Sequence, residues 1–423
     1  MESKKIYFPG LNGLRFWAAF LVILHHVEQF KLWQGMPNLF RNTTVEAVGH
    51  QGVSLFFVLS GFLITYLLLA EYEKTHHIAV KNFYIRRILR IWPLYYLIMI
   101  IGFFILPHFI NIGPVSQLNE HFTLKVLLFM FMLPNVLRVT EAPIVGANQA
   151  WSVGVEEQFY IVWPLLIRTF RKVLLKFLII FIVLKFAVTV LMAVSLDHFL
   201  SPDYQYMMYF RTIQRFWDLL QIEQMSFGAI GAYVLFYKKE KILKLIYHPA
   251  TQILMAVGIV FILTVRFKFI GQTLFDALLF TILIINVSTN KNFVLKLENR
   301  FYSYLGNISY GIYMFHTLCI AVVLTLLQKT SLYESNPAVF NAILYVGSVV
   351  MTIVVAGLSY KYFESFFLKL KEKFMIVMSS TRKDSRAVAS GKPNSVLPDT
   401  PAPVSVSLHA VKADEIKNKK IRE

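Results

Sequence analysis

The sequence predicts an all-α integral membrane protein, a polytopic bundle of about ten transmembrane helices with both termini in the cytoplasm. Of its 423 residues, 57% are hydrophobic and only 16% are charged, and the apolar residues gather in long runs. The formal net charge is +18, but the basic residues lie in short loops between these runs. That distribution is typical of membrane topogenesis and does not indicate a nucleic-acid partner.

The predicted spans follow one another along most of the chain, since about 20 apolar residues cross a bilayer. The first run is long, contains ionisable residues and lacks a small-residue cleavage site, so we interpret it as a retained span rather than a signal peptide. The apolar run 125–137 is too short to cross and is interpreted as interfacial or re-entrant. The expected spans are 12–31, 51–70, 90–108, 148–167, 173–195, 214–237, 250–266, 271–287, 305–327 and 339–363.

The basic residues orient these spans. At each successive crossing, one set of loop ends is rich in Lys and Arg and the opposite set has far fewer. Positive loops stay inside, so both termini are predicted to be cytoplasmic. The basic set comprises Lys4, Lys5, Lys74, Lys81, Arg86, Arg87, Arg90, Arg168, Arg171, Lys172, Lys176, Lys238, Lys239, Lys241, Lys244, Lys291, Lys296 and Arg300.

The chain divides into two regions of different composition. Residues 1–365 hold the predicted transmembrane domain, whereas residues 376–423 are rich in Ser, Pro and Lys with few large apolar side chains. Such a segment cannot bury enough surface to offset the entropy of ordering. We therefore expect a disordered basic cytoplasmic tail. A single cysteine, Cys319, excludes an intramolecular disulfide.

The first span, GLRFWAAFLVILHHVEQF, carries Arg15, His25 and His26. Eleven residues advance an α-helix by about 1,100°, so Arg15 and His26 lie on one face, about 16 Å apart along the axis. His25 points about 80° away. One interpretation is that Arg15 reaches to the interface while His26 bonds within the bundle. We favour an intramembrane site, with a histidine suited to proton exchange near neutral pH.

A second candidate site lies at the start of the fourth span, in ANQAWSVGVEEQFYIVWPLL. Glu156 and Glu157 are consecutive, so they face about 100° apart, and only one readily points at a given site. Either a carboxylate orients a histidine or binds acceptor hydroxyls, or the pair belongs to a wet extracytoplasmic rim. Trp151 is either a platform for a sugar ring or an interfacial belt residue.

A third candidate is KNFYIRRILRIWPLYYL, at the start of the third span. Arg86 and Arg90 are spaced i, i+4 and share a face. They either enforce topology or form a phosphate-binding patch. In the ninth span, SYLGNISYGIYMFHT places Tyr310 and His316, and for His316 alone we favour a structural role. The small residues of QIEQMSFGAIGAY predict close helix packing in the sixth span.

Five motifs, in order along the chain, resemble the membrane-bound acyltransferase-3 family, whose O-acyltransferases modify surface polysaccharides and related acceptors. The motifs are LNGLRFWAAFLVILHH, GVSLFFVLSGFLITYLL, FYIRRILRIWPLYY, NQAWSVGVEEQFYIVWPLL and LGNISYGIYMFH. The resemblance covers about residues 6 to 365. It implies a ten-helix domain in the plasma membrane that takes a coenzyme A thioester, expected to be acetyl-CoA, from the cytoplasm.

The resemblance also implies site residues. The family's first-span arginine falls on Arg15 and its essential histidine on His26, with Glu156 and Glu157 matching the acidic pair after Trp-Ser. The sequence departs from the family at two positions, Asn12 where Asp is usual and Gln221 where Arg is common, and neither is given catalytic weight. Some members carry an additional extracytoplasmic esterase-like domain, for which we expect this chain to be too short.

The expected reaction is acyl transfer from cytoplasmic acyl-CoA to a hydroxyl of a surface or lipid-linked carbohydrate, with membrane lipids as surroundings. Arg15, Arg86 and Arg90 are expected to bind the donor phosphates. His26 is expected to act as general base or to form a transient acyl-histidine, and whether His25 takes this role is open. Arg15, Glu156 and Glu157 complete the expected catalytic set. The expected acceptor-binding residues are His25, Trp151, Ser152, Tyr310 and His316.

Two other classes remain open at this stage. A transporter or flippase of lipid-linked sugar also buries charges in its spans, and a scaffold without activity needs no intact site. The sequence shows no metal-ligand spacing, P-loop, dinucleotide fingerprint or GxSxG elbow, so no metal or permanently bound cofactor is expected. It indicates neither the acceptor, nor the acyl chain length, nor the oligomeric state.

Overall fold

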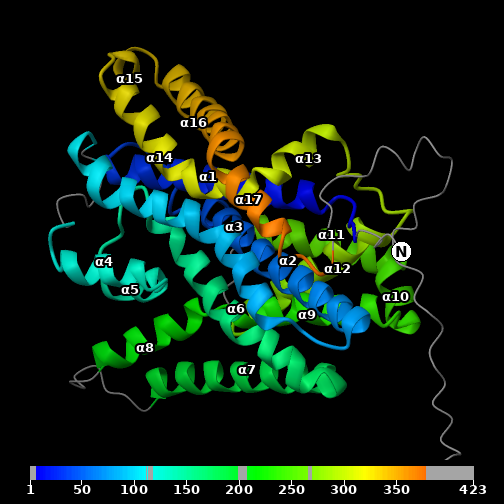
Figure 1. Cartoon of the computed structure of the whole chain (residues 1–423). Coiled ribbons are helices and arrows are strands. Elements are labelled where there is room, and N and C mark those ends of the chain that lie inside the picture. Colours follow the sequence, from blue (N-terminus) through cyan, green and yellow to red (C-terminus); the bar gives the residue numbers. More distant parts are fainter. Residues whose placement is uncertain (1–5, 111, 113–117, 199–206, 265–268, 378–423) are drawn as a thin grey trace, which may run out of the picture.

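The computed structural model describes residues 6–110, 112, 118–198, 207–264 and 269–377, and every regular element in these ranges is helical (Figure 1). The expected tail, apart from residues 376 and 377, lies outside the described residues. The principal helices are α1 (Leu11–Trp33), α2 (Thr43–Thr75), α3 (Val80–Ile100), α4 (Phe122–Met130), α5 (Pro134–Thr140), α6 (Trp151–Phe170), α7 (Leu174–His198), α8 (Met207–Leu219), α9 (Ile222–Phe236), α10 (Glu240–Tyr247), α11 (Pro249–Thr264), α12 (Gln272–Thr289), α13 (Arg300–Asn307), α14 (Ser309–Gln328), α15 (Leu332–Ser335), α16 (Pro337–Ser359) and α17 (Ser365–Glu372). Short 3₁₀ and π segments are η1 (Ile101–Ile105), η2 (Leu106–His108), η4 (Asn148–Ala150), η5 (Arg171–Val173) and η6 (Tyr360–Glu364).

The helices confirm a multi-span membrane protein. Each predicted span falls on one helix or on two or three consecutive helical elements. In the described ranges, 7 stretches are long and apolar enough to cross a membrane, or up to 8 if the α10–α11 pair, bent by 62°, is one span. α1 is not among the 7, because its ionisable residues lower its hydropathy, and α6 and α7 count together as one 48-residue stretch. The number of ten and the cytoplasmic termini stay predictions.

Two segments differ from a simple row of spans. The run 125–137 forms the short helices α4 and α5, with 9 and 7 residues, which are too short to cross. The predicted span 214–237 is interrupted between Leu219 and Ile222, so that α8 and α9 are separate helices. The two helices still count together as one candidate span, Met207–Phe236. Just after the break, Glu223 of α9 forms a buried ion pair with Lys185 of α7 at 2.7 Å.

The contact between α2 and α9 depends on glycines, as the small residues of the sixth span predict. Gly228 lies against the Val58 carbonyl, and Gly61 lies against the backbone of Met225. A Cβ atom on Gly61 would lie 1.9 Å from the Met225 carbonyl oxygen. Only a residue without a side chain lets the two backbones approach this closely.

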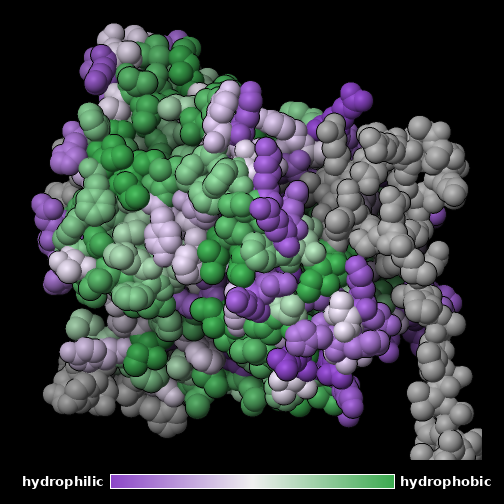
Figure 2. Space-filling model, viewed as in Figure 1, coloured by the Kyte–Doolittle hydropathy of each residue, from purple (hydrophilic) through white to green (hydrophobic). Residues whose placement is uncertain are grey.

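Apolar side chains also face outward, as expected of a surface in contact with lipid. On α16, Val346, Val350 and Val354 recur every four residues and are 63%, 53% and 53% exposed. Figure 2 shows apolar side chains over the part of this face near α14 and α16, and hydrophilic ones gathered toward α10. The outer stripe of α16 therefore suits a hydrocarbon environment.

We predict that Gly61→Ala destabilises the protein by about 3 kcal/mol, because the new methyl group overlaps main-chain atoms that cannot rotate away. Gly347→Ala is the matched control, since a Cβ atom on Gly347 would lie 3.4 Å from its nearest neighbour, a Val323 methyl carbon, which is an ordinary contact. Thermal unfolding in detergent measures both. Equal melting temperatures for the two variants would show that the α2–α9 contact tolerates separation.

Candidate active site

A cavity of about 210 Å³ lies among α1, α2, α3, α6, α14 and the C-terminal segment. Part of its lining is apolar and includes Phe56, Leu63 and Ile64 of α2. Its polar lining comes from segments that are distant in sequence and comprises Tyr7, Asn12, Arg15, Ser60, Glu71, Arg86, Arg87, Arg90, Ser152, Glu156, Tyr160, Ser309, Tyr310, Tyr313 and Lys371.

Cations outnumber carboxylates in this lining. The three arginines that the sequence singled out for phosphate binding, Arg15, Arg86 and Arg90, all face the cavity, and Arg87 and Lys371 join them. Sequence reasoning missed the last two: Arg87 was assigned only to topology, and Lys371 follows the last predicted span. Against these five cations stand two carboxylates in the lining, those of Glu71 and Glu156. The cavity is therefore suited to a polyanion.

The five cations differ in how they are partnered. Arg86 donates to Glu71 Oε2 at 3.0 Å and to the Phe374 carbonyl at 2.8 Å. The Arg87 guanidinium lies 5.2 Å from the centre of the Tyr160 ring. Arg15, Arg90 and Lys371 form no ion pair with another described residue, so their charge is available to a ligand.

The two adjacent glutamates face different surroundings, as their 100° separation predicts. Glu156 lines the cavity and accepts hydrogen bonds from Ser60 Oγ at 2.9 Å and Tyr160 OH at 2.8 Å. Glu157 accepts from Trp92 Nε1 at 3.0 Å, away from the cavity lining. Neither carboxylate contacts a histidine of the described residues.

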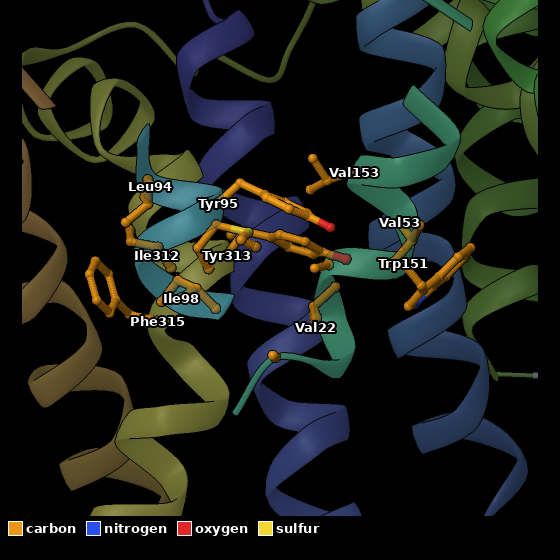
Figure 3. Close-up of a cluster of buried hydrophobic side chains, with 14 of the residues drawn as sticks. Val22, Val53, Leu94, Tyr95, Ile98, Trp151, Val153, Ile312, Tyr313 and Phe315 are labelled. Carbon is orange, nitrogen blue, oxygen red and sulfur yellow. The ribbon is translucent and has the colours of Figure 1, made fainter. Parts of the chain in front are cut away.

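Hydrogen-bonded side chains close the inner end of the cavity. Tyr313 OH lies 2.7 Å from Ser152 Oγ and donates to the Gln149 carbonyl at 3.0 Å. Figure 3 shows Tyr313 reaching from α14 toward the beginning of α6, between Val22 and Tyr95. Tyr310, one turn earlier on α14, donates to the Ile91 carbonyl at 2.9 Å. Ser152, Tyr310 and Tyr313 are thus wall residues of the cavity.

Three histidine rings lie in a row behind this inner wall. His316 is fully buried, and its ring centre is 5.7 Å from that of Tyr313 and 4.8 Å from that of His26. The His25 ring follows at 5.1 Å from His26 and packs against Gly49. The sequence alone favoured a structural role for His316, but in the structure its ring packs against the ring of His26, the candidate base.

Main-chain carbonyls fix how these histidines carry their protons. His26 Nδ1 lies 2.9 Å from the Val22 carbonyl, His316 Nδ1 2.6 Å from the Tyr313 carbonyl, and His25 Nδ1 3.1 Å from the Val45 carbonyl. A carbonyl only accepts, so each neutral ring holds its proton on Nδ1 and its lone pair on Nε2. Nδ1 of His26 is thus bonded to a main-chain carbonyl and not to Glu156 or Glu157, and the orienting role considered for a carboxylate stays a prediction.

Trp151 is covered in this structure. It is 8% exposed, with the Arg138 guanidinium 4.7 Å from its ring centre and Phe57 edge-on at 6.2 Å. A sugar ring would stack on Trp151 only after Arg138 moved aside. Burial lowers the pKa of Arg138 in the short helix α5 from its ordinary value. Among the described residues, no group of three or more His, Cys, Asp or Glu side chains is placed to hold a metal ion.

Comparison with known proteins finds relatives along most of the chain. The peptidoglycan O-acetyltransferase OatA of Listeria monocytogenes is 28% identical over 386 residues, which are 86% of this chain and 56% of that protein. A putative O-acetyltransferase of Staphylococcus aureus is 27% identical over 380 residues, covering 87% of this chain and 58% of its own length. The putative peptidoglycan O-acetyltransferase YrhL of Bacillus subtilis is 28% identical over 380 residues, covering 85% and 54%.

The chain thus spans 54–58% of the length of these relatives. No solved structure matches it. The model of the acyltransferase-3 family, described as an acyltransferase domain, matches residues 8–361, nearly all of the helical bundle. The chain belongs to this acyltransferase family.

Proposed function

We propose that the protein is a membrane O-acetyltransferase that moves an acetyl group from cytoplasmic acetyl-CoA to a hydroxyl of a cell-wall glycan. The observation that carries the proposal is that a cavity lined by cations ends at Tyr313, and that the rings of His316 and His26 lie directly behind Tyr313. Two relatives are named as peptidoglycan O-acetyltransferases, one of them putatively, which supports a glycan acceptor. We place the reaction in the plasma membrane.

The cavity fits the two chemical parts of an acyl-CoA donor. Arg15, Arg86, Arg87 and Arg90 supply guanidinium groups, which bind phosphate oxygens through paired N–H donors. The apolar part of the lining, which includes Phe56, Leu63 and Ile64, suits the pantetheine arm, which carries little charge. In this arrangement the thioester lies at the inner end, beside Tyr313 and Ser152.

His26 is the proposed general base. Its Nε2 lone pair removes the proton of the acceptor hydroxyl as the hydroxyl oxygen attacks the thioester carbonyl. The carbon–sulfur bond breaks, and the departing thiolate of coenzyme A takes up the proton held on Nε2. In the variant through an acyl-histidine, Nε2 itself attacks the thioester carbonyl, the carbon–sulfur bond breaks and the thiolate of coenzyme A leaves. The acceptor hydroxyl oxygen then attacks the acyl-imidazole, the bond between the acyl group and Nε2 breaks, and the hydroxyl proton passes to the thiolate. The Val22 carbonyl holds the ring in the tautomer that both routes need.

We also revise two of the other expected assignments. We assign Glu156 to the donor cavity, since both of its oxygens are bonded to neighbouring hydroxyl groups there. We extend the catalytic domain beyond residue 365, because Lys371, Met375 and Val377 line the same cavity. A transporter or flippase is the weaker alternative, since membership of an acyltransferase family favours group transfer.

We predict that His26→Ala lowers acetyl transfer by about a thousandfold, the loss expected when a positioned general base is removed. Purified protein, labelled acetyl-CoA and peptidoglycan fragments provide the assay. His25→Ala is the matched control, because the neighbouring ring faces Val45 and should lose far less. Near-normal transfer by His26→Ala with loss in His25→Ala would assign the base to His25. Failure to transfer label to any glycan, with lipid-linked sugar moved instead, would favour the flippase.

We also predict that Glu156→Gln tightens the binding of CoA about fivefold, because it removes a negative charge from the wall that faces the phosphates. Glu157→Gln is the isosteric control at the adjacent position and should leave the dissociation constant unchanged, since Glu157 faces Trp92 outside the cavity. Calorimetric titration with CoA measures both. Weaker binding in Glu156→Gln, or equal effects in the two variants, would remove Glu156 from the donor site.

A further inference from the structure

The segment that follows α16 crosses the mouth of the cavity. The π segment η6 follows α16 directly, and α17 continues the helix from Ser365 and packs against α3 (Figure 1). Lys371, Met375 and Val377 of this segment line the cavity beside residues of α1, α2 and α3. π segments of this kind often mark functional positions in helices.

Two cations hold the backbone of this segment in place. Arg86 Nη1 donates to the Phe374 carbonyl at 2.8 Å, and Lys74 Nζ donates to the Ile376 carbonyl at 3.1 Å. Arg86 also binds Glu71, whose other oxygen accepts from the Ala79 amide at 2.8 Å. The segment is thus attached to α2 and α3 by contacts from charged groups to neutral carbonyls. A phosphate group is a stronger acceptor for such cations than a carbonyl is.

Lys371 adds a positive charge to a wall that is already cationic. It is half-buried and forms no ion pair with another described residue. The positive charges of Arg15, Arg87 and Arg90 line the same cavity. Like charges gathered in a partly buried space repel one another, and an anion bound among them removes the repulsion. Lys369 and Lys373, two residues away on either side, are exposed and do not line the cavity.

We propose that residues 371–377 form a strap that completes the donor site: Lys371 binds a phosphate group of the donor, and the backbone from Phe374 to Val377 closes over it. The strap releases its carbonyl contacts to Lys74 and Arg86 when the donor enters, and it closes again once the phosphates bind Lys371. The inference rests on the proposed acyl-CoA donor.

The first test measures CoA affinity by calorimetry in nanodiscs of phosphatidylcholine alone, so that no anionic lipid competes for the cations. Lys371→Ala should weaken binding about tenfold, as expected for loss of one charge-assisted phosphate contact, whereas Lys371→Arg should retain affinity. Lys369→Ala is the control from the same helix and should bind as the unsubstituted protein does. Equal affinity in Lys371→Ala and Lys369→Ala would overturn the strap proposal and leave the proposed function standing. Absence of CoA binding by the unsubstituted protein would overturn both.

The second test follows the strap itself and does not depend on removing Lys371. A spin label on Lys373→Cys reports the mobility of the segment, with labelling of the buried Cys319 subtracted from the unsubstituted protein. Saturating CoA should reduce the mobile fraction of this label. The same label on Lys369→Cys, one turn earlier on α17, should not respond. An unchanged Lys373 spectrum while CoA binds would show that the segment is a fixed wall and would overturn the closure.

Discussion

An ionisable side chain inside an apolar helical bundle needs a partner, because leaving its charge or polar atoms without one costs several kcal/mol. Most of the interior of this bundle obeys that constraint pairwise. Lys185 meets Glu223 at 2.7 Å, and Gln51 donates to Asp276 at 2.8 Å. Each of these pairs joins helices, although Gln51 Oε1 and Asp276 Oδ1 stay buried without a hydrogen-bond partner among the described residues. The candidate site differs because several of its charged side chains, Arg15, Arg90 and Lys371, form no ion pair with another described residue. Behind it, His316 Nε2 is also buried without a hydrogen-bond partner in the described part of the chain.

Two helices, α1 and α14, connect the cavity to the buried histidines. α1 carries Arg15 at the cavity and His26 three turns later, while α14 carries Tyr310 and Tyr313 in the cavity wall and His316 one turn beyond. The cavity and the histidine pair therefore keep their separation as long as the two helices keep their register. Gly49 and Gly52 let α2 approach α1 closely along the same stretch, which fixes the position of the histidines further.

Helical periodicity made part of the site predictable. It placed Arg15 and His26 on one face, grouped Arg86 with Arg90 and turned Glu156 away from Glu157, because these relations depend only on residues within one helix. Periodicity does not specify which helices touch. The contact of His26 with His316 joins residues 290 positions apart, and Lys371 lines the cavity although it lies beyond the last apolar run. The ion pair of Glu223 on α9 likewise depends on Lys185, which lies on a different helix, α7.

The closed inner wall, formed by Tyr313 and Ser152, affects whether a thioester in the cavity is hydrolysed by water activated at His26. A neutral histidine with a free Nε2 can activate water as readily as a sugar hydroxyl, so a continuous aqueous path between cavity and histidine would favour hydrolysis. Tyr313 and Ser152 interrupt that path through a 2.7 Å hydrogen bond. Each hydroxyl also bonds a main-chain carbonyl or lies near one on η4, so the pair can open by a side-chain rotation without disturbing the helices. In the proposed reaction, the acceptor hydroxyl displaces the hydrogen bond between Tyr313 and Ser152, so that the acyl group can reach His26. The acceptor hydroxyl then occupies the position beside His26 that water would otherwise take.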